Sequence, residues 1–226
     1  MHSEWELKKL LVEIGQRVWT RGFVAANDGN FSVRLSENRI LTTPTGVSKG
    51  FMRTEMIVKV NLEGKVIEGD RRFKPSSELP MHLEVYRQRP DVQAVVHAHP
   101  PYATAFAVAG IPLDRCILPE AVVALGAVPI APFAVPSTEE VPRSIRELIR
   151  TYDAILLENH GALTVGNDLL SAYYRLETLE HTAHIIFNAM QLGKINVLSS
   201  DVVQRLNSLR EKYGVKGLGA SCRSED

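Results

Sequence analysis

The sequence predicts an α/β fold: a three-layer αβα sandwich around a largely antiparallel central sheet. Short apolar or alternating segments, typical of strands, are interleaved with longer segments of helical periodicity. Tight turns join several neighbouring strand segments, which favours antiparallel pairing, and helices would cover the sheet. The 226 residues suffice for one sizeable core, and we find neither a linker nor an internal repeat. We therefore expect a single domain over residues 1–226.

The N-terminal part of the chain combines one amphipathic helix with strand pairs. Apolar residues at helical spacing predict a helix over residues 4–22. Alternating or apolar stretches over residues 31–35 and 39–42 are separated by a turn, which predicts two paired strands. Residues 57–61 and 64–68 are expected to form a hairpin.

The rest of the chain alternates buried strands with helices. A helix is expected over residues 78–89, where Pro80 is tolerated in the first turn. The apolar run over residues 93–97 predicts a buried strand. Further helices are expected over residues 101–110, 118–126, 138–151, 168–193 and 199–213, and further strands over 127–130, 154–157 and 163–165.

The composition disfavours several classes of protein. Lysine and arginine total 26, as do aspartate and glutamate, so the formal net charge of zero gives no sign of nucleic-acid or membrane-surface binding. No apolar stretch is long enough to span a membrane, and no signal peptide is evident. Cys116 and Cys222 are too few for a disulfide framework. We expect a protein of the reducing cytoplasm.

Three histidines and one carboxylate have the pattern of a metal site. His97 and His99 lie at the end of an apolar strand, where side chains two residues apart point to the same face. His160 follows a second apolar strand, and Glu78 lies at the start of a predicted helix. Three imidazoles with an open position form a known catalytic zinc arrangement. The same ligands would accept Mn²⁺, Co²⁺ or Fe²⁺.

The remaining histidines have plainer interpretations. His181 and His184 lie three residues apart on a long helix and are interpreted as surface or interface residues. His82 lies one turn beyond Glu78 on the same helix face, where it could support the metal site. An isolated His-x-His pair is itself weak evidence, and the third strand-end histidine is what favours a metal centre.

Three polar loops are suited to bind an anion. Ser76 and Ser77 open a helix, where hydroxyls and free backbone N–H groups attract phosphate. The loops Gly29-Asn30 and Thr45-Gly46 would add donors, because glycine lets the backbone approach a ligand closely. Taken alone, each loop indicates only a helix cap or a turn. Their coexistence with a metal site predicts a small phosphorylated substrate.

The chain resembles the class II aldolase and adducin-head family, especially its fuculose-1-phosphate aldolase branch. The resemblance extends from the first helix to about Tyr213 and rests on five motifs in order: Gly29-Asn30-Phe31-Ser32, Pro44-Thr45-Gly46, Lys74-Pro75-Ser76-Ser77-Glu78, Val95-Val96-His97-Ala98-His99 and Glu158-Asn159-His160-Gly161. It implies a compact αβα fold and a homotetramer with active sites between subunits.

The resemblance also assigns roles to residues. It implies Zn²⁺ bound by His97, His99 and His160, with Glu78 both near the metal and acting as the catalytic acid and base. It implies a catalytic tyrosine at Tyr213 that reaches the substrate across the interface. The implied phosphate contacts are Gly29, Asn30, Thr45, Gly46, Ser76 and Ser77.

The expected activity is reversible cleavage of a ketose 1-phosphate to dihydroxyacetone phosphate and an aldehyde. Two departures concern the aldehyde side: Ile117-Leu118-Pro119-Glu120 and Ala131-Pro132-Phe133 lack tyrosines found in the family's aldolases. A sugar-phosphate 4-epimerase and a sugar-acid phosphate decarboxylase are alternatives, since both use an enediolate. The epimerase branch usually has aspartate where Glu78 stands. A non-catalytic adducin-like module is a further alternative.

Overall fold

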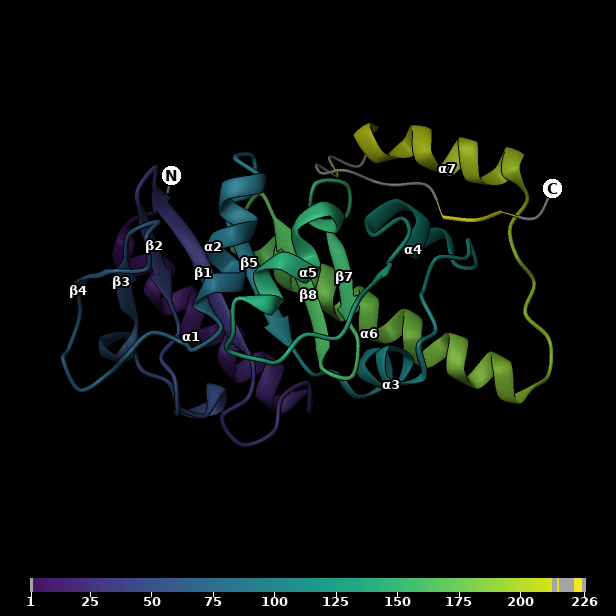
Figure 1. The fold of residues 1–226 in the computed structure, drawn as a ribbon. Coiled ribbons are helices and arrows are strands. Elements are labelled where there is room, and N and C mark those ends of the chain that lie inside the picture. The colour runs from purple at the N-terminus through teal and green to yellow at the C-terminus, as the bar shows by residue number, and fades with distance from the viewer. Residues whose placement is uncertain (1, 213–214, 216–221, 225–226) are drawn as a thin grey trace.

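The computed structural model describes residues 2–212, 215 and 222–224, and it confirms the predicted αβα architecture. An eight-stranded sheet has the order β4-β3-β2-β1-β5-β8-β7-β6 (Figure 1). Strands β6 and β7 pair in parallel, whereas the other six neighbouring pairs of this sheet are antiparallel. The central sheet is therefore largely antiparallel, as the tight turns predict.

The elements follow the predicted order closely. The strands are β1 (Asn30–Ser36), β2 (Arg39–Thr42), β3 (Val58–Val60), β4 (Val66–Glu68), β5 (Ala94–Ala98), β6 (Ile130–Ala131), β7 (Ala154–Leu157) and β8 (Gly161–Gly166). The α-helices are α1 (Glu4–Thr20), α2 (Leu79–Gln88), α3 (Pro101–Ala109), α4 (Pro119–Ala124), α5 (Glu140–Ile149), α6 (Leu169–Gln191) and α7 (Ser200–Lys212).

Two apolar cores cover the two faces of the sheet. Helices α1, α3 and α6 pack on one face, where Phe31 and Val96 join the same buried cluster as Leu176. Helices α2 and α5 pack on the other face, where Val95 joins Ile145. Because Val95 and Val96 are neighbours in β5, their opposite directions follow from strand alternation, and this central strand is buried on both sides.

The first helix begins where its sequence predicts. The Ser3 hydroxyl accepts a hydrogen bond from the backbone N–H of Glu6, and the Glu6 carboxylate accepts one from the Ser3 N–H. This capping box satisfies two backbone donors that the helix leaves free. Leu11, Ile14 and Val18 then form a fully buried stripe against the sheet, so the helix face and its start are both set by local sequence.

Some boundaries differ from those predicted. Strand β6 contains only Ile130 and Ala131, because Val128 instead pairs with Leu113 in an isolated bridge. Two short 3₁₀ helices, η1 (Lys49–Phe51) and η2 (Thr54–Met56), were not predicted; each is a single turn, too short to produce a periodic pattern. In the part of the chain described, no helix has both the length and the apolar character to cross a membrane.

The two cysteines form a disulfide that sequence analysis did not anticipate. Cys116 bonds to Cys222, 106 residues further along, with 5.2 Å between their Cα atoms. Both cysteines are buried in a small apolar cluster with Val122 and Val203. The bond joins the C-terminal segment to the region beside α4. Disulfides are rare in reducing compartments, so this pairing does not support the expected cytoplasmic location.

A buried ion cluster supports the central sheet and gives a stability prediction. Asp153, just before β7, lies 2.9 Å from a guanidinium nitrogen of Arg89 and 3.2 Å from one of Arg175. All three side chains are buried. Asp153→Ala removes a buried carboxylate shared by two buried guanidinium groups, so we expect the free energy of unfolding to fall by about 3–5 kcal/mol in urea titrations.

Asp70→Ala is the matched control, because Asp70 pairs with Arg72, which is largely exposed to solvent. This second change should cost less than about 1 kcal/mol. Equal effects of the two substitutions would contradict the structural role of Asp153.

Candidate active site

The fold brings the three predicted histidines together. His97 lies within β5 and His99 just after it, whereas His160 lies in the turn between β7 and β8. Strands β5 and β8 pair with Ala98 opposite Ala162, so the end of β5 meets the start of β8. The three imidazole centroids are 4.8–5.0 Å apart. The proposed ligands therefore converge from distant segments on one point.

The turn that carries His160 depends on a glycine. Asn159 adopts a positive φ of 54°, and Gly161 follows His160 directly. A Cβ atom on Gly161 would lie 2.6 Å from both the Ala98 carbonyl oxygen and the His99 ring. Since no side chain fits in this space, Gly161 lets the two histidine-bearing segments approach each other.

Glu78 joins this cluster from the start of α2. Its Oε2 atom lies 3.2 Å from His97 Nε2, and its Oε1 atom lies 3.3 Å from His160 Nε2. Asn30 donates a hydrogen bond of 2.8 Å from Nδ2 to Oε2. Among the described residues, Oε1 is buried without a hydrogen-bond partner. A buried carboxylate oxygen in this state calls for a further ligand.

The histidine contacts indicate that this ligand is a cation. His97 Nδ1 lies 3.0 Å from the Ala162 carbonyl oxygen, which can only accept, so Nδ1 carries the proton and Nε2 presents its lone pair. His99 Nδ1 faces the Asp28 carboxylate at 3.5 Å, which leaves His99 Nε2 as an acceptor. The two Nε2 atoms are 3.1 Å apart. Facing acceptors repel unless a cation lies between them, so the residues fit a metal ion.

The pKa values agree with this interpretation. Burial is the main cause that lowers the pKa of His99 and of His160 to about 4, and a protonated His97 would act in the same direction. Burial alone would raise the pKa of Glu78, but interactions with His97, His160 and Asn30 outweigh it, so this pKa lies well below its usual range. At neutral pH the site offers two neutral imidazoles and a carboxylate.

The three anion loops line one cavity of about 320 Å³ next to the histidines; its lining includes Gly29, Asn30, Thr45, Gly46, Ser76, Ser77, Glu78, His99 and His160. Two backbone hydrogen bonds hold the second and third loops side by side: Thr45 N–H to the Lys74 carbonyl, and Ser76 N–H to the Thr43 carbonyl. All six predicted phosphate contacts thus border one space.

Gly29 and Asn30 have different positions in this lining. Gly29 has a φ of +74°, and a Cβ atom there would lie 2.7 Å from Val24 and 3.0 Å from the His97 carbonyl oxygen. Asn30 is buried, and both ends of its amide already contact protein groups, Glu78 and His82. Asn30 therefore retains one Nδ2 hydrogen for a ligand, whereas the neighbouring loops present hydroxyls and backbone groups.

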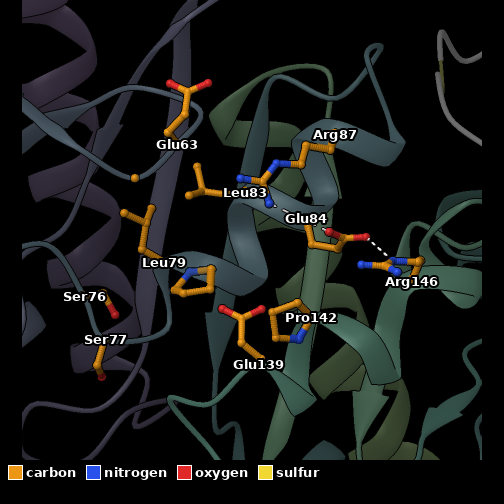
Figure 2. A pocket seen from close by; sticks show the side chains of 12 residues that line it. Glu63, Ser76, Ser77, Leu79, Leu83, Glu84, Arg87, Glu139, Pro142 and Arg146 are labelled. Atoms are coloured by element: carbon orange, nitrogen blue, oxygen red, sulfur yellow. Dashed lines mark hydrogen bonds and ion pairs between the residues drawn. The ribbon is translucent and has the colours of Figure 1, made fainter.

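A second cavity of about 430 Å³ borders Ser76 and Ser77 on another side. Figure 2 shows Arg87 and Arg146 there, both directed toward Glu84. Arg87 also donates to the Leu62 carbonyl. Because these cations already have protein partners, the cavity beside the histidines is the better candidate for a phosphate.

Behind Glu78, a chain of buried hydrogen bonds crosses from α2 to β1. Glu78 accepts only, so Asn30 presents its NH₂ group to Glu78 and its oxygen to His82 Nε2, at 2.6 Å. His82 Nε2 must then donate, and Nδ1 accepts from the Ser32 hydroxyl at 2.7 Å. Ser32 in turn accepts from the Tyr86 hydroxyl at 2.8 Å. Every donor in this chain points toward Glu78.

The other candidate residues have different surroundings. His82, considered at the sequence level as a supporting residue, is fully buried in this chain. His181 is exposed on α6, and His184 stacks on Tyr102 with 3.9 Å between ring centroids, away from the histidine cluster. Tyr213 lies outside the described residues. Lys49, which also lines the candidate cavity, was missed because a lysine in a loop normally reads as a surface residue.

The fold and the site together define a class of protein, and comparison with known proteins names it. Residues 9–187 match the family of class II aldolase and adducin N-terminal domains. The chain belongs to this family, as the five sequence motifs indicated.

Two groups of relatives have different activities. The 3-oxo-tetronate 4-phosphate decarboxylase of Haemophilus influenzae is 35% identical over 205 residues, covering 89% of this chain and 96% of the relative. An L-fuculose phosphate aldolase of Methanococcus maripaludis is 36% identical over 174 residues, covering 77% of this chain and 92% of the relative. Both groups belong to the same family, but their members catalyse two different reactions.

Solved structures give the same picture. One neighbour is a Klebsiella pneumoniae protein described as an aldolase, epimerase or decarboxylase. It superimposes with a TM-score of 0.84 at 33% identity, covering 91% of this chain and all of that one. An L-fuculose 1-phosphate aldolase superimposes with a TM-score of 0.83 at 30% identity, covering 95% and 98%.

Loss of one converging imidazole should abolish metal binding. We expect His160→Ala, supplied with Zn²⁺ and then desalted, to retain well under half an ion per chain, because a three-ligand site loses a strong donor. The measurement is metal content by atomic emission. The matched control His181→Ala removes an exposed histidine and should leave the metal content of the chain unchanged. Equal metal content in the two variants would argue against the site.

The hydrogen-bond chain predicts the protonation state of His82. Burial lowers the pKa of His82 to about 3, so its imidazole stays neutral as the pH falls from 8 to 5. We expect two-dimensional ¹H–¹⁵N spectra to show a protonated Nε2 and an unprotonated Nδ1 throughout this range. A protonated Nδ1 at His82 would reverse the direction of the chain.

Proposed function

We propose that this protein is a metal-dependent lyase that removes CO₂ from a phosphorylated 3-oxo sugar acid of the 3-oxo-tetronate 4-phosphate type. The observation that carries the proposal is the match to the decarboxylases, which spans 89% of this chain and 96% of the Haemophilus influenzae relative. The convergence of three histidines and one carboxylate beside an anion-binding cavity supports an enzyme rather than an adducin-like interaction module.

The protein groups have separate tasks in this proposal. His97, His99 and His160 hold the cation, with Glu78 next to them. A bound divalent cation supplies Lewis-acid stabilisation of negative charge on substrate oxygens. Zinc fits the three imidazoles, although Mn²⁺, Co²⁺ and Fe²⁺ use the same donors. The phosphate binds at the loops of Gly29-Asn30, Thr45-Gly46 and Ser76-Ser77, which fixes the reacting carbons relative to the histidines.

The bond changes follow from the substrate's structure. A four-carbon acid with a ketone at C3 is a β-keto acid, so the C1–C2 bond can break while its electron pair forms an enediolate across C2 and C3. The carboxylate leaves as CO₂. Glu78, after taking a proton from solvent, delivers it to C2, and the product is dihydroxyacetone phosphate. Asn30 holds the carboxylate of Glu78 in place for this transfer.

Aldol cleavage of a fuculose 1-phosphate-like ketose 1-phosphate is the second candidate. The aldolase relatives at 36% identity favour it. It would produce the same enediolate and the same dihydroxyacetone phosphate, but the leaving fragment is an aldehyde whose hydroxyl must lose a proton. In this proposal Tyr213 would take that role. The segment Ile117–Glu120 and Phe133 lack the tyrosines that the aldolase branch places there, which favours decarboxylation.

A homotetramer with active sites between subunits is part of the proposal. Trp19 and Phe51 are both substantially exposed and pack edge to face, 5.3 Å between ring centroids. Phe51 closes the short helix that Lys49 of the candidate cavity begins. Exposed aromatic residues at this place support contact with a second copy of the chain. A cytoplasmic location stays a proposal as well.

The reaction is tested by product analysis. The Zn²⁺-supplied protein is incubated with 3-oxo-tetronate 4-phosphate and, separately, with fuculose 1-phosphate, and CO₂, aldehyde and dihydroxyacetone phosphate are quantified. We expect CO₂ and dihydroxyacetone phosphate from the first substrate at a kcat/KM at least tenfold above that for the second. The opposite preference would make aldol cleavage the function.

Glu78→Gln tests the proton transfer in the same assay. We expect kcat to fall about 10²–10⁴-fold, because the amide cannot carry the proton. The exposed Glu147→Gln is the control and should leave kcat unchanged. Metal content is measured alongside, since Glu78 adjoins the histidines. Full kcat in a metal-loaded Glu78→Gln protein would remove Glu78 from the mechanism.

A further inference from the structure

Lys49 is a buried lysine in the lining of the candidate cavity. It begins η1 (Lys49–Phe51), just after the Thr45-Gly46 loop, and only 1% of its surface is exposed. A buried ammonium group is costly unless it has partners, so its position requires an explanation.

The ammonium joins two of the anion loops. Lys49 Nζ donates to the Asn27 carbonyl at 2.9 Å and to the Val47 carbonyl at 2.7 Å. Asn27 precedes Gly29-Asn30, and Val47 follows Thr45-Gly46. These contacts use two of the three N–H donors of an ammonium group. One side chain thus fixes the relative positions of two loops and retains a donor beside the cavity.

The surroundings of Lys49 differ from those of a structural buried lysine. Lys59 is also buried, and it pairs with the carboxylates of Glu4 and Glu68 at 2.7 and 2.8 Å. In the described part of the chain, Lys49 has carbonyl partners and no ion pair, with Asp28 as the nearest influence on its charge. Burial lowers the pKa of Lys49 to about 8, and the charge of Asp28 acts in the opposite direction.

Lys49 is the cationic side chain that the cavity can offer to an anion. Among its described lining residues, Lys49 is the single lysine or arginine, whereas Asp28 and Glu78 are acidic. The arginines of the neighbouring cavity face Glu84 instead (Figure 2). A phosphate ester carries close to two negative charges at neutral pH. A dianion entering between these loops would therefore meet the Lys49 ammonium, which has carbonyl partners but no ion pair.

We propose that Lys49 is a phosphate-binding and positioning residue: its ammonium holds the Gly29-Asn30 and Thr45-Gly46 loops together and balances the charge of the substrate's phosphate. Lys49 then makes the site select phosphorylated over unphosphorylated substrates. The inference rests on the proposed phosphate site, but it is independent of which carbon–carbon bond is broken.

Binding of inorganic phosphate tests this role without any turnover. Isothermal titration calorimetry is carried out on the Zn²⁺-supplied wild-type protein and on Lys49→Met, which keeps most of the length of the side chain but removes its charge. We expect Kd for phosphate to rise about tenfold or more in Lys49→Met, as for loss of a charged hydrogen-bond partner. The control Lys59→Met removes another buried lysine, one that is paired with two carboxylates, and should change Kd less than twofold.

The steady-state constants distinguish phosphate binding from a purely structural role. In Lys49→Met, KM for the phosphorylated substrate should rise at least as strongly as kcat falls, and Lys49→Arg should recover part of the phosphate affinity. A folded, metal-loaded Lys49→Met protein with wild-type phosphate affinity would overturn the proposal. If phosphate binding depends on Lys49 but neither sugar substrate is cleaved, the proposed reaction fails and this inference stands.

A measurement on the wild-type protein covers the case in which Lys49→Met does not fold. Buried ammonium groups exchange protons slowly, so Lys49 can give its own ¹H–¹⁵N signal. Adding inorganic phosphate should shift this signal clearly, whereas the Lys59 signal should stay in place. An unchanged Lys49 signal at saturating phosphate would also overturn the proposal.

Discussion

The active site depends on one electrostatic constraint: several hydrogen-bond acceptors are held facing one another in a buried space. The Nε2 atoms of His97 and His99 are 3.1 Å apart, and the Glu78 carboxylate lies 3.2 Å from the former. A proton or a metal ion among the acceptors relieves their mutual repulsion. The β5–β8 pairing and the absence of a side chain at Gly161 serve this arrangement, because both bring separate segments into contact.

The buried chain behind Glu78 follows from two matched periodicities. Asn30 and Ser32 are two residues apart on β1 and share a face, whereas His82 and Tyr86 are four residues apart on α2 and share a face. The two pairs interlock, so each of these four side chains has a hydrogen-bond partner. These hydrogen bonds offset the cost of burying the four polar groups. As a result, a sheet–helix contact orients the side chain proposed to transfer the proton.

The sequence predicted the features that arise from periodicity or from clustered motifs. The apolar runs that place His97 and His160 at strand ends were sufficient to predict their convergence, and the loop motifs predicted the cavity lining. Features created by contacts between distant segments were missed. Nothing local distinguishes buried Lys49 from a surface lysine, and nothing local pairs Cys116 with Cys222 across 106 residues. The role of Tyr213 remains a prediction.

The demand for protons explains how one site can serve the two proposed reactions and where these reactions would differ. Both reactions generate the same enediolate, so the cation, the phosphate loops and Glu78 do not distinguish them. They differ in the fragment that leaves. An aldehyde leaves only if a base takes the proton of its hydroxyl, whereas CO₂ leaves without any proton transfer. Phe133 and Ile117 cannot act as bases, so aldol cleavage would depend on Tyr213 in the role proposed for it. The proposed decarboxylation would not need that residue.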